Sequence, residues 1–460
     1  MLSNNDEAVS SRYRDVDRSY VEPISIENIV KIAQHEGINE VLLQFSGKKV
    51  ISMAHALALR GLKVIGGSDG LKEKIHELLT QPLLGLSQVP SMTTTDHQQL
   101  NQFIDKYGFP LLIGGSSQQI KQKSAVVYDK PAMEQYLVET QLDRLVASLF
   151  IEGCKYEVIG ISDGDTVTIP GVIEHLEQTG SHASDSIAVF KPQSLAAKDE
   201  QLMIQASMTM LHQLSSIGIF NLHFLRANNA LYLLQIKPYA GHNVAFLSQA
   251  LGQDITACAT NVLIGKKLKT MGFPEGTWES NQFIHIKMPV FSYIDYQSEN
   301  TFDSKMKSSG SVIGRDTQLA KALYKGYEAS DLPIPSYGTI FISVRDQDKV
   351  AATELAIRFH RLGFKILATE GTANMFAEAG ITTGVVTKIH DNSHNLLTKI
   401  RQHKVGMVIN ITNLSDAASQ DAIAIRDQAL YTHIPVCSTL ETAELVAKVL
   451  ESLALTTLPI

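Results

Sequence analysis

The C-terminal part of the chain has the clearest pattern of apolar and polar positions. Short apolar runs at residues 339–344, 365–368 and 406–412 alternate with segments such as 349–363, in which apolar side chains recur every three or four positions. Apolar runs of this length predict buried strands, and the wider spacing predicts amphipathic helices. Because strands that alternate with helices favour a parallel sheet covered on both faces, residues 338–460 are expected to form a doubly wound α/β domain.

The N-terminal part shows a shorter version of the same alternation. One helix is expected over residues 48–61 and a strand over 62–67, and no strand, glycine loop and helix of the dinucleotide-binding kind precede them. This part is therefore expected to be a partial α/β domain that ends near residue 68.

The middle of the chain mixes strands and helices differently. Strand-like runs are present at residues 109–115, 124–129, 143–151, 156–162, 166–176, 220–227 and 230–238. One long helix is expected over 196–217, and the last two strands are expected to form a hairpin across Asn228 and Asn229. The pattern predicts an α+β domain over 69–270, followed by a proline-containing connecting region over 271–337 that closes with a linker.

Composition and charge narrow the classes of function. The 460 residues are 44% hydrophobic and 19% charged, which is enough apolar material for ordinary cores, and the net charge of −7 disfavours general binding to nucleic acid or to an anionic membrane. The three cysteines lie far apart, so neither a disulfide framework nor a zinc site is indicated. The polar N-terminus and the lack of a long apolar run predict a soluble, cytoplasmic protein.

Four segments carry motifs in a fixed order. They are "SNNDEAVSSRYRDVDRSYVEPIS" from Ser3, "IEHLEQTGSHASDS" from Ile173, "NLHFLRANNALYLLQIKP" from Asn221 and "GFKILATEGTANMFAEAGI" from Gly363. Together they resemble the large subunit of carbamoyl phosphate synthetase, specifically its C-terminal half, and they imply a place in pyrimidine and arginine metabolism. The implied domains are a truncated pre-ATP-grasp domain at 1–68, an ATP-grasp domain at 69–270, a connecting helical region at 271–337 and a methylglyoxal-synthase-like regulatory domain at 338–460.

The ATP-grasp half of active members uses MgATP to phosphorylate carbamate, which gives carbamoyl phosphate. By this resemblance, the metal-ligand positions, which carry glutamine, glutamate and asparagine in the family, fall on His223, Gln235 and Lys237. Two arginines that hold the acidic substrate fall on Tyr239 and His242. Magnesium needs oxygen ligands to neutralise phosphoryl charge, so the site is expected to be degenerate, and ATP and magnesium are expected as cofactors only if the activity persists.

Other parts of the nucleotide site are changed as well. The family's acidic triplet falls on Lys155, Glu157 and Ile159, so one acid of three remains. Gly114 and Gly115 are expected only as a turn, where the family has a flexible glycine-rich loop. Each change alone is compatible with weak binding, but together they remove the metal and guanidinium groups that electrostatic catalysis requires.

A polar cluster beside this site is a candidate pocket. Its residues are Glu157, Glu174, His175, His182, Asp185 and Ser186. The spacing is not the HExxH pattern of a zinc site, so no metal is expected, and the two interpretations are residual ligand binding and a polar loop satisfied by its own hydrogen bonds. Lys237 similarly fits either metal-free binding of an anion or a solvent-facing lysine at a strand end.

The segment "TEGT" follows a predicted strand and opens a predicted helix, where Thr369, Gly371 and Thr372 can present hydroxyl and N–H groups to an anion. A threonine helix cap alone produces the same letters. In the resembled family this pocket takes phosphorylated effectors, and the matched positions are Ser343, Lys349, Thr369, Thr372, Lys388, Asn410 and Thr412. Because no aspartate base for the methylglyoxal synthase reaction is found in a matching loop, binding is expected and catalysis is not.

The sequence therefore predicts a large-chain-like protein that binds a phosphorylated metabolite or nucleotide in its C-terminal domain for regulation. The expected partners are this small effector and either a complete synthetase or further copies of the same chain, but neither nucleic acid nor membrane. Two alternatives stay open, namely an active ligase half that phosphorylates carbamate and a structural pseudo-subunit.

Overall fold

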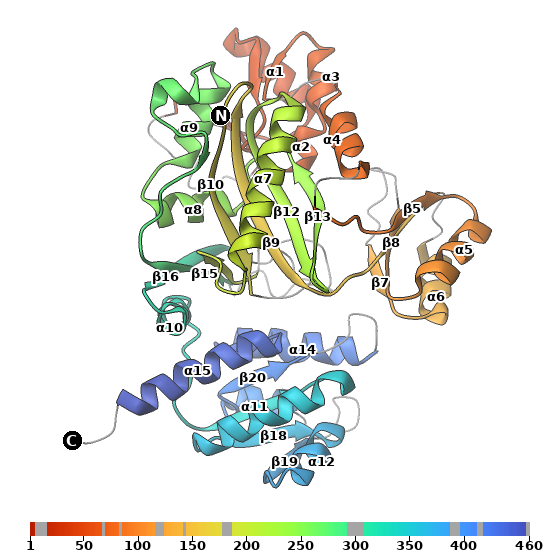
Figure 1. The fold of residues 1–460 in the computed structure, drawn as a ribbon, viewed down its shortest axis with the longest axis vertical. Helices are drawn as coiled ribbons and strands as arrows, with labels where there is room; N and C mark the ends of the chain where they lie inside the picture. Colours follow the sequence, from red (N-terminus) through yellow and green to blue (C-terminus); the bar gives the residue numbers. More distant parts are fainter. Residues whose placement is uncertain are drawn as a thin grey trace.

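The computed structural model of the protein has an upper part built around one large sheet and a lower part built around a second sheet (Figure 1). It describes residues 1–4, 16–66, 70–81, 85–115, 124–140, 144–176, 186–291, 308–386, 396–411 and 417–456. Among these residues, no helix is both long and apolar enough to cross a membrane.

The N-terminal residues form two small pairs of parallel strands with short helices. The elements are β1 (Leu2–Ser3), β2 (Tyr20–Val21), α1 (Ile26–Glu36), β3 (Glu40–Leu42), α2 (Lys48–Ile51), α3 (Ala54–Ala58), β4 (Lys63–Ile65) and α4 (Leu71–Thr80). β1 pairs with β2, and β3 pairs with β4. The single helix predicted over 48–61 is wrong, because the chain forms two short helices that are interrupted at Ser52. The Ser52 hydroxyl donates to the Lys49 carbonyl at 2.7 Å and so competes with the regular helical pattern.

A four-stranded antiparallel sheet with two helices lies at the right of Figure 1. Its elements are β5 (Ser91–Thr94), α5 (His97–Tyr107), β6 (Leu111–Gly115), β7 (Ala125–Val127), α6 (Lys130–Thr140) and β8 (Leu145–Leu149). Gly114 and Gly115 do not form the expected turn, because they end β6 and pair with Val146 and Leu145. A Cβ added at Gly114 would lie 2.6 Å from the Ser124 hydroxyl, so glycine allows a close approach here.

An eight-stranded, mostly antiparallel sheet is the centre of the upper part. Its strands are β9 (Cys154–Asp163), β10 (Val167–His175), β11 (Ala188–Phe190), β12 (Ile217–Ala227), β13 (Ala230–Lys237), β14 (Gly276–Thr277), β15 (Ile284–Val290) and β16 (Gly310–Asp316), in the order β13-β12-β9-β10-β11-β15-β16 with β14 beside β10. Helix α7 (Ala197–Leu214) packs on one face, and α8 (Asn243–Leu251) and α9 (Ile255–Leu263) pack on the other (Figure 1). The predicted hairpin is confirmed, since Asn228 and Asn229 have the positive φ values of 49° and 59° that such a turn requires.

The region 271–337 extends this sheet. Strands β15 and β16 pair with each other, and β15 also pairs with β11. The implied helical character of this region is therefore wrong at these strands. In β15 the apolar Ile284, Ile286 and Met288 alternate with the polar His285 and Lys287, which is the side-chain spacing of a strand. Helix α10 (Leu319–Ala329) follows them.

The C-terminal residues form the predicted doubly wound domain. Its elements are β17 (Thr339–Ser343), α11 (Lys349–Arg361), β18 (Lys365–Thr369), α12 (Glu370–Glu378), β19 (Thr383–Val386), α13 (Leu396–Arg401), β20 (Met407–Asn410), α14 (Ala417–Tyr431), β21 (Val436–Cys437) and α15 (Leu440–Thr456). The strands lie in the order β19-β18-β17-β20-β21, and every pair is parallel. The apolar runs are confirmed as strands buried on both faces by helices.

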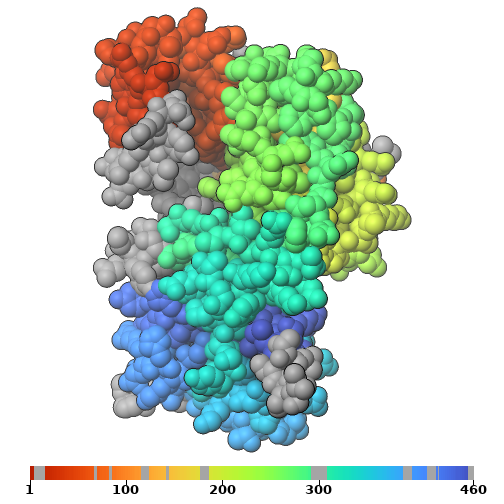
Figure 2. Space-filling view, turned by 90° about the vertical axis from the view of Figure 1, so that its left-hand side faces the viewer, coloured from red at the N-terminus to blue at the C-terminus, as the bar shows by residue number. Residues whose placement is uncertain are grey.

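One apolar core continues from the upper part into the lower part. Tyr327 of α10 is buried in the same cluster as Ile286 of β15 and Val446 of α15. Figure 2 shows the teal segment that contains α10 at the surface between the two parts. An ion pair also crosses this boundary, since Arg345 Nη1 lies 3.1 Å from Glu152 Oε1. The second sheet begins at β17, and the apolar core of the upper part continues into it.

One buried side chain joins the N-terminal residues to the large sheet. The Gln44 side chain is fully buried, and its Nε2 donates to the Gly66 carbonyl at 2.7 Å while its Oε1 accepts from the Ile219 N–H at 2.9 Å. The Gln44 carbonyl accepts from the Ala240 N–H at 2.8 Å. This fit requires Gly218, because a Cβ added there would lie 2.0 Å from Gln44 Oε1.

Candidate functional site

Strand alternation places the changed nucleotide-site residues on one face of the large sheet. His223 on β12 lies opposite Glu157 on β9 and Gln235 on β13, and Asn221 lies opposite Lys237. Directly opposed residues of antiparallel strands point to the same face. These five residues therefore share the face that α8 covers, which we call the polar face.

Glu157 is at the centre of a buried network on the polar face. Its Oε2 accepts a hydrogen bond from Asn243 Nδ2 at 2.7 Å, and His175 Nε2 lies 3.5 Å from the same oxygen, at ion-pair distance but without hydrogen-bond geometry. Asn243 Oδ1 accepts from Lys287 Nζ at 2.8 Å, and His175 Nδ1 hydrogen-bonds with Ser186 Oγ at 2.7 Å. All five side chains are buried, so the network is formed away from solvent.

Burial and neighbouring charges set the ionisation of these groups. Burial alone would raise the pKa of Glu157, but its polar neighbours, His175 first among them, lower that pKa well below its usual range. Burial lowers the pKa of His223 to about 4, so its ring is neutral at pH 7. Burial also lowers the pKa of Lys237, although the charge of Glu157 opposes this shift.

Three polar atoms of the polar face are buried without a hydrogen-bond partner in the described part of the chain. They are Asn221 Oδ1, His223 Nε2 and His175 Nε2. The backbone at Gly241 also lies close to these side chains, because a Cβ added there would lie 2.3 Å from Asn221 Nδ2 and 3.2 Å from Glu157 Oε1. Buried polar atoms normally have partners, so the polar face is a candidate site for a polar ligand.

The polar face does not fit a magnesium ion. Mg²⁺ requires oxygen ligands in near-octahedral geometry. Glu157 is the carboxylate that the face supplies, and the nearby Lys237 contributes an ammonium in place of a ligand oxygen. Within the described ranges, no group of three His, Cys, Asp or Glu side chains is arranged to hold a metal.

The candidate polar pocket is only partly assembled. Glu174 lies on the opposite face from Glu157, because it alternates with His175 along β10. Its carboxylate accepts from the N–H groups of Gln193 and Ser194 at 2.5 and 3.2 Å and from the Ser194 hydroxyl, so it holds the loop before α7. Two predicted members, His182 and Asp185, lie outside the described residues.

The two positions matched to substrate-binding arginines lie between β13 and α8. The Tyr239 carbonyl accepts from Asn221 Nδ2 at 3.2 Å, and burial raises the pKa of the Tyr239 phenol. His242 directly precedes α8. The backbone of Tyr239 is thus hydrogen-bonded to Asn221 of the polar face. Neither Tyr239 nor His242 provides a guanidinium group.

Asn221, Asn243 and Lys287 also belong to this site, although they were not among the residues predicted for it. Polar residues at alternate positions of otherwise apolar strands, as in "FNLHF" and "IHIKM", are the signal that marks the first and the last of them. Asn243 has no comparable signal, because it begins a helix and reaches Glu157 from a distant part of the sequence.

A second set of matched residues lies at the carboxyl ends of the C-terminal strands. Ser343 ends β17, Thr369 ends β18 and Asn410 ends β20, and Ser343 is paired directly with Asn410. Ligands of open α/β sheets bind at this edge. We call this set the carboxyl edge. Two other matched positions, Lys388 and Thr412, lie outside the described residues.

Helix α12 begins at the carboxyl edge. Thr369 precedes the helix, and its hydroxyl lies 3.3 Å from that of Thr372. A Cβ added at Gly371 would lie 3.3 Å from Lys349 Nζ, so this ammonium lies against the first turn of α12. Lys349 also pairs with the exposed Asp346 at 2.7 Å. A cation beside a helix N-terminus is unfavourable, whereas an anion bound between them would be attracted by both.

Solved structures share the fold of the upper part. N5-carboxyaminoimidazole ribonucleotide synthetase from Thermotoga maritima is similar with a TM-score of 0.52 and 12% identity, over 72% of this chain and 90% of that chain. The synthetase from Staphylococcus aureus gives 0.53 and 12%, over 71% and 89%. Biotin carboxylase from Campylobacter jejuni gives 0.50 and 13%, over 63% and 69%. At these identities the likeness shows the fold alone.

Three family models match successive parts of the chain. The carbamoyl phosphate synthase preATP-grasp domain matches residues 1–71, the ATP binding domain of the carbamoyl-phosphate synthase L chain matches 73–271, and the MGS-like domain matches 351–438. Their order agrees with the partial α/β domain, the large sheet and the doubly wound domain described above. The chain belongs to the carbamoyl phosphate synthetase large-chain family and corresponds to one half of such a subunit.

Proposed function

We propose that this protein is a catalytically impaired member of the family that binds a phosphorylated metabolite or nucleotide at the carboxyl edge for regulation. The observation that supports this best is Lys349 Nζ, which lies against the first turn of α12 near the Thr369 and Thr372 hydroxyls. A phosphate between these groups would meet a positive charge, hydroxyl groups and helix N–H donors together.

Loss of catalysis is supported by the chemistry of the polar face. Phosphoryl transfer from ATP depends on cations that neutralise the developing charge on the phosphates. Here Glu157 is already engaged by Asn243 and His175, and Lys237 stands at a position matched to a metal ligand. The polar face therefore lacks, among the described residues, the ligands that would hold MgATP in a reactive geometry.

The regulatory part of the proposal needs a connection between the carboxyl edge and the central domain. Arg345 lies two residues beyond Ser343 and pairs with Glu152, which precedes β9 and its Glu157. Ligand binding at the carboxyl edge would act on this ion pair and so reach the polar face. The proposed recipient of the signal is a complete synthetase or another copy of this chain.

Replacing Lys349 with glutamine should abolish stabilisation by a phosphorylated ligand. A nucleoside monophosphate at about 100 times its Kd stabilises the folded protein by about 2.7 kcal/mol, which raises the thermal midpoint by several degrees. Differential scanning fluorimetry of the full chain checks this, with Lys448→Gln at an exposed position of α15 as the matched control. An equal shift in Lys349→Gln and the parent would contradict a carboxyl-edge site, and no shift with any monophosphate would favour a structural pseudo-subunit.

Incubation of the pure protein with MgATP and carbamate should release no ADP beyond the protein-free background. The reason is that the polar face lacks a fitting magnesium site among the described residues. A coupled ADP assay measures the release, with a complete synthetase as the positive control. Magnesium-dependent formation of ADP and carbamoyl phosphate would instead establish the active ligase half.

A further inference from the structure

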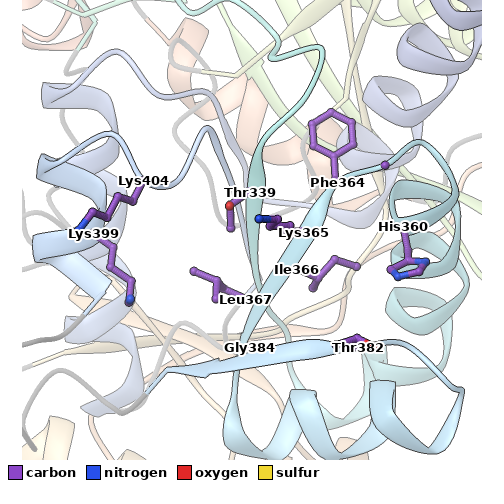
Figure 3. A pocket seen from close by; sticks show the side chains of 11 residues that line it. Thr339, His360, Phe364, Lys365, Ile366, Leu367, Thr382, Gly384, Lys399 and Lys404 are labelled. Carbon is purple, nitrogen blue, oxygen red and sulfur yellow. The ribbon is translucent and has the colours of Figure 1, made fainter.

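A hollow of about 680 Å³ lies at the opposite edge of the C-terminal sheet from Ser343 and Asn410. It opens at the first residues of two strands, Thr339 of β17 and Lys365 of β18, and it extends along β18 towards β19 (Figure 3). We call it the strand-start pocket. Its volume lies in the range of small-molecule sites, roughly 300–1,000 Å³.

Among the described residues, the strand-start pocket is lined by three lysines and by no carboxylate. Lys365, Lys399 and Lys404 line it, together with His360. Lys365 and Lys404 are exposed and Lys399 is half-buried, and in the described part of the chain none of the three lysines forms an ion pair. These three positive charges, which have no ion-pair partner among the described residues, stand out in a chain whose net charge is −7. Their mutual repulsion is relieved when an anion is bound.

The three lysines and His360 come from different elements and lie around the hollow. In Figure 3, Lys399 of α13 and Lys404, which follows that helix, lie on one side, His360 of α11 lies on the other, and Lys365 lies between them. Ile366, Leu367 and Gly384 contribute apolar wall. Because the ammonium groups come from separate elements, they suit an anion that carries more than one charged group.

We propose that the strand-start pocket binds a small anion of the polyphosphate type, with two or more linked phosphates, and that no divalent metal is required. Lysine ammonium groups act as point charges and are established phosphate ligands. Here they supply the countercharge that magnesium provides elsewhere. The site is separate from the carboxyl edge, and the proposal does not depend on the function proposed for that edge.

Isothermal titration of the full chain with tripolyphosphate in metal-free buffer tests this proposal. The parent protein should bind it, and Lys399→Gln/Lys404→Gln should bind at least tenfold more weakly with an unchanged thermal midpoint. The matched control, Lys321→Gln/Lys448→Gln, removes the same charge from exposed positions of α10 and α15 and should bind like the parent. Lys349→Gln should also keep tripolyphosphate binding, which separates this result from the test of the carboxyl edge.

Three outcomes would overturn the proposal. The first is no heat of binding for tripolyphosphate with the parent, and the second is equal binding by the two double variants, which would reduce the effect to net charge. The third is equal or tighter binding of citrate or orthophosphate by Lys349→Gln, in which the carboxyl edge is disabled, because a site built for linked phosphates should discriminate against both. If the double variant does not fold, Lys365→Gln replaces it under the same criteria.

Discussion

Gly218→Ala is expected to lower the free energy of unfolding by about 3–6 kcal/mol, the sum of three costs that act together. The residue has a φ of 128°, which side chains rarely adopt, and an added Cβ would lie 2.0 Å from Gln44 Oε1. Gln44 is fully buried. Its displacement would break the hydrogen bonds to Gly66 and Ile219 and leave a buried N–H group unsatisfied. The midpoint of urea unfolding measures the loss.

Gly252→Ala is the matched control for this prediction. Gly252 also has a positive φ, 68°, but nothing lies within 4 Å of an added Cβ. Its replacement should therefore cost only the backbone strain, about 1 kcal/mol. Equal losses of unfolding free energy in Gly218→Ala and Gly252→Ala would show that the contact with Gln44 contributes nothing to the destabilisation.

Stability should fall by about 3 kcal/mol as the pH is lowered from above 6.5 to 4 because of His223 alone. Burial lowers the pKa of His223 to about 4 in the folded protein, against an ordinary value of 6.5. Between these two values the unfolded chain binds a proton that the folded chain does not, so unfolding is favoured as the pH falls. Glu157 acts in the same direction below its ordinary pKa of 4.5, because its folded pKa is lowered and its ionised form is the stabilising one.

Urea midpoints at pH 7.5, 5.5 and 4.5 measure this dependence. His223→Gln removes the titrating ring and should flatten the decline between pH 6.5 and 4, leaving the smaller slope from His285, whose pKa burial also lowers. His76→Gln, at an exposed position of α4, should keep the parent's slope. The same slope in all three proteins would mean that His223 is protonated freely in the folded state.

Much of the fold could be predicted because local sequence patterns determine many of its strands and turns. The C-terminal strands are apolar runs buried on both faces, and the hairpin is set by two adjacent asparagines that accept a positive φ. Strands β15 and β16 were not predicted, because Pro289 interrupts the apolar run and because β15 pairs with β11, a segment far away in the chain.

The candidate site was predicted less completely, for a different reason. The resemblance identified His223, Gln235 and Lys237, and strand register places them together. Proximity in sequence misled the prediction at Glu174, which neighbours His175 in the chain but lies on the other face of the sheet. Contacts such as Asn243 with Glu157 depend on the position of α8, which no local pattern determines.

The apolar core that joins α10 to α15 also bears on how such a protein can evolve. Tyr327 of α10, Ile286 of β15 and Val446 of α15 are buried in one cluster, although β15 belongs to the large sheet and α15 to the C-terminal domain. Recombination that replaced the C-terminal domain at the start of β17 would leave Tyr327 facing a surface that did not arise with it. Exchange of the doubly wound domain alone is therefore expected to disrupt this shared core. Its inheritance is tied to that of α10 and the β15–β16 edge, and substitutions on the two sides should compensate one another.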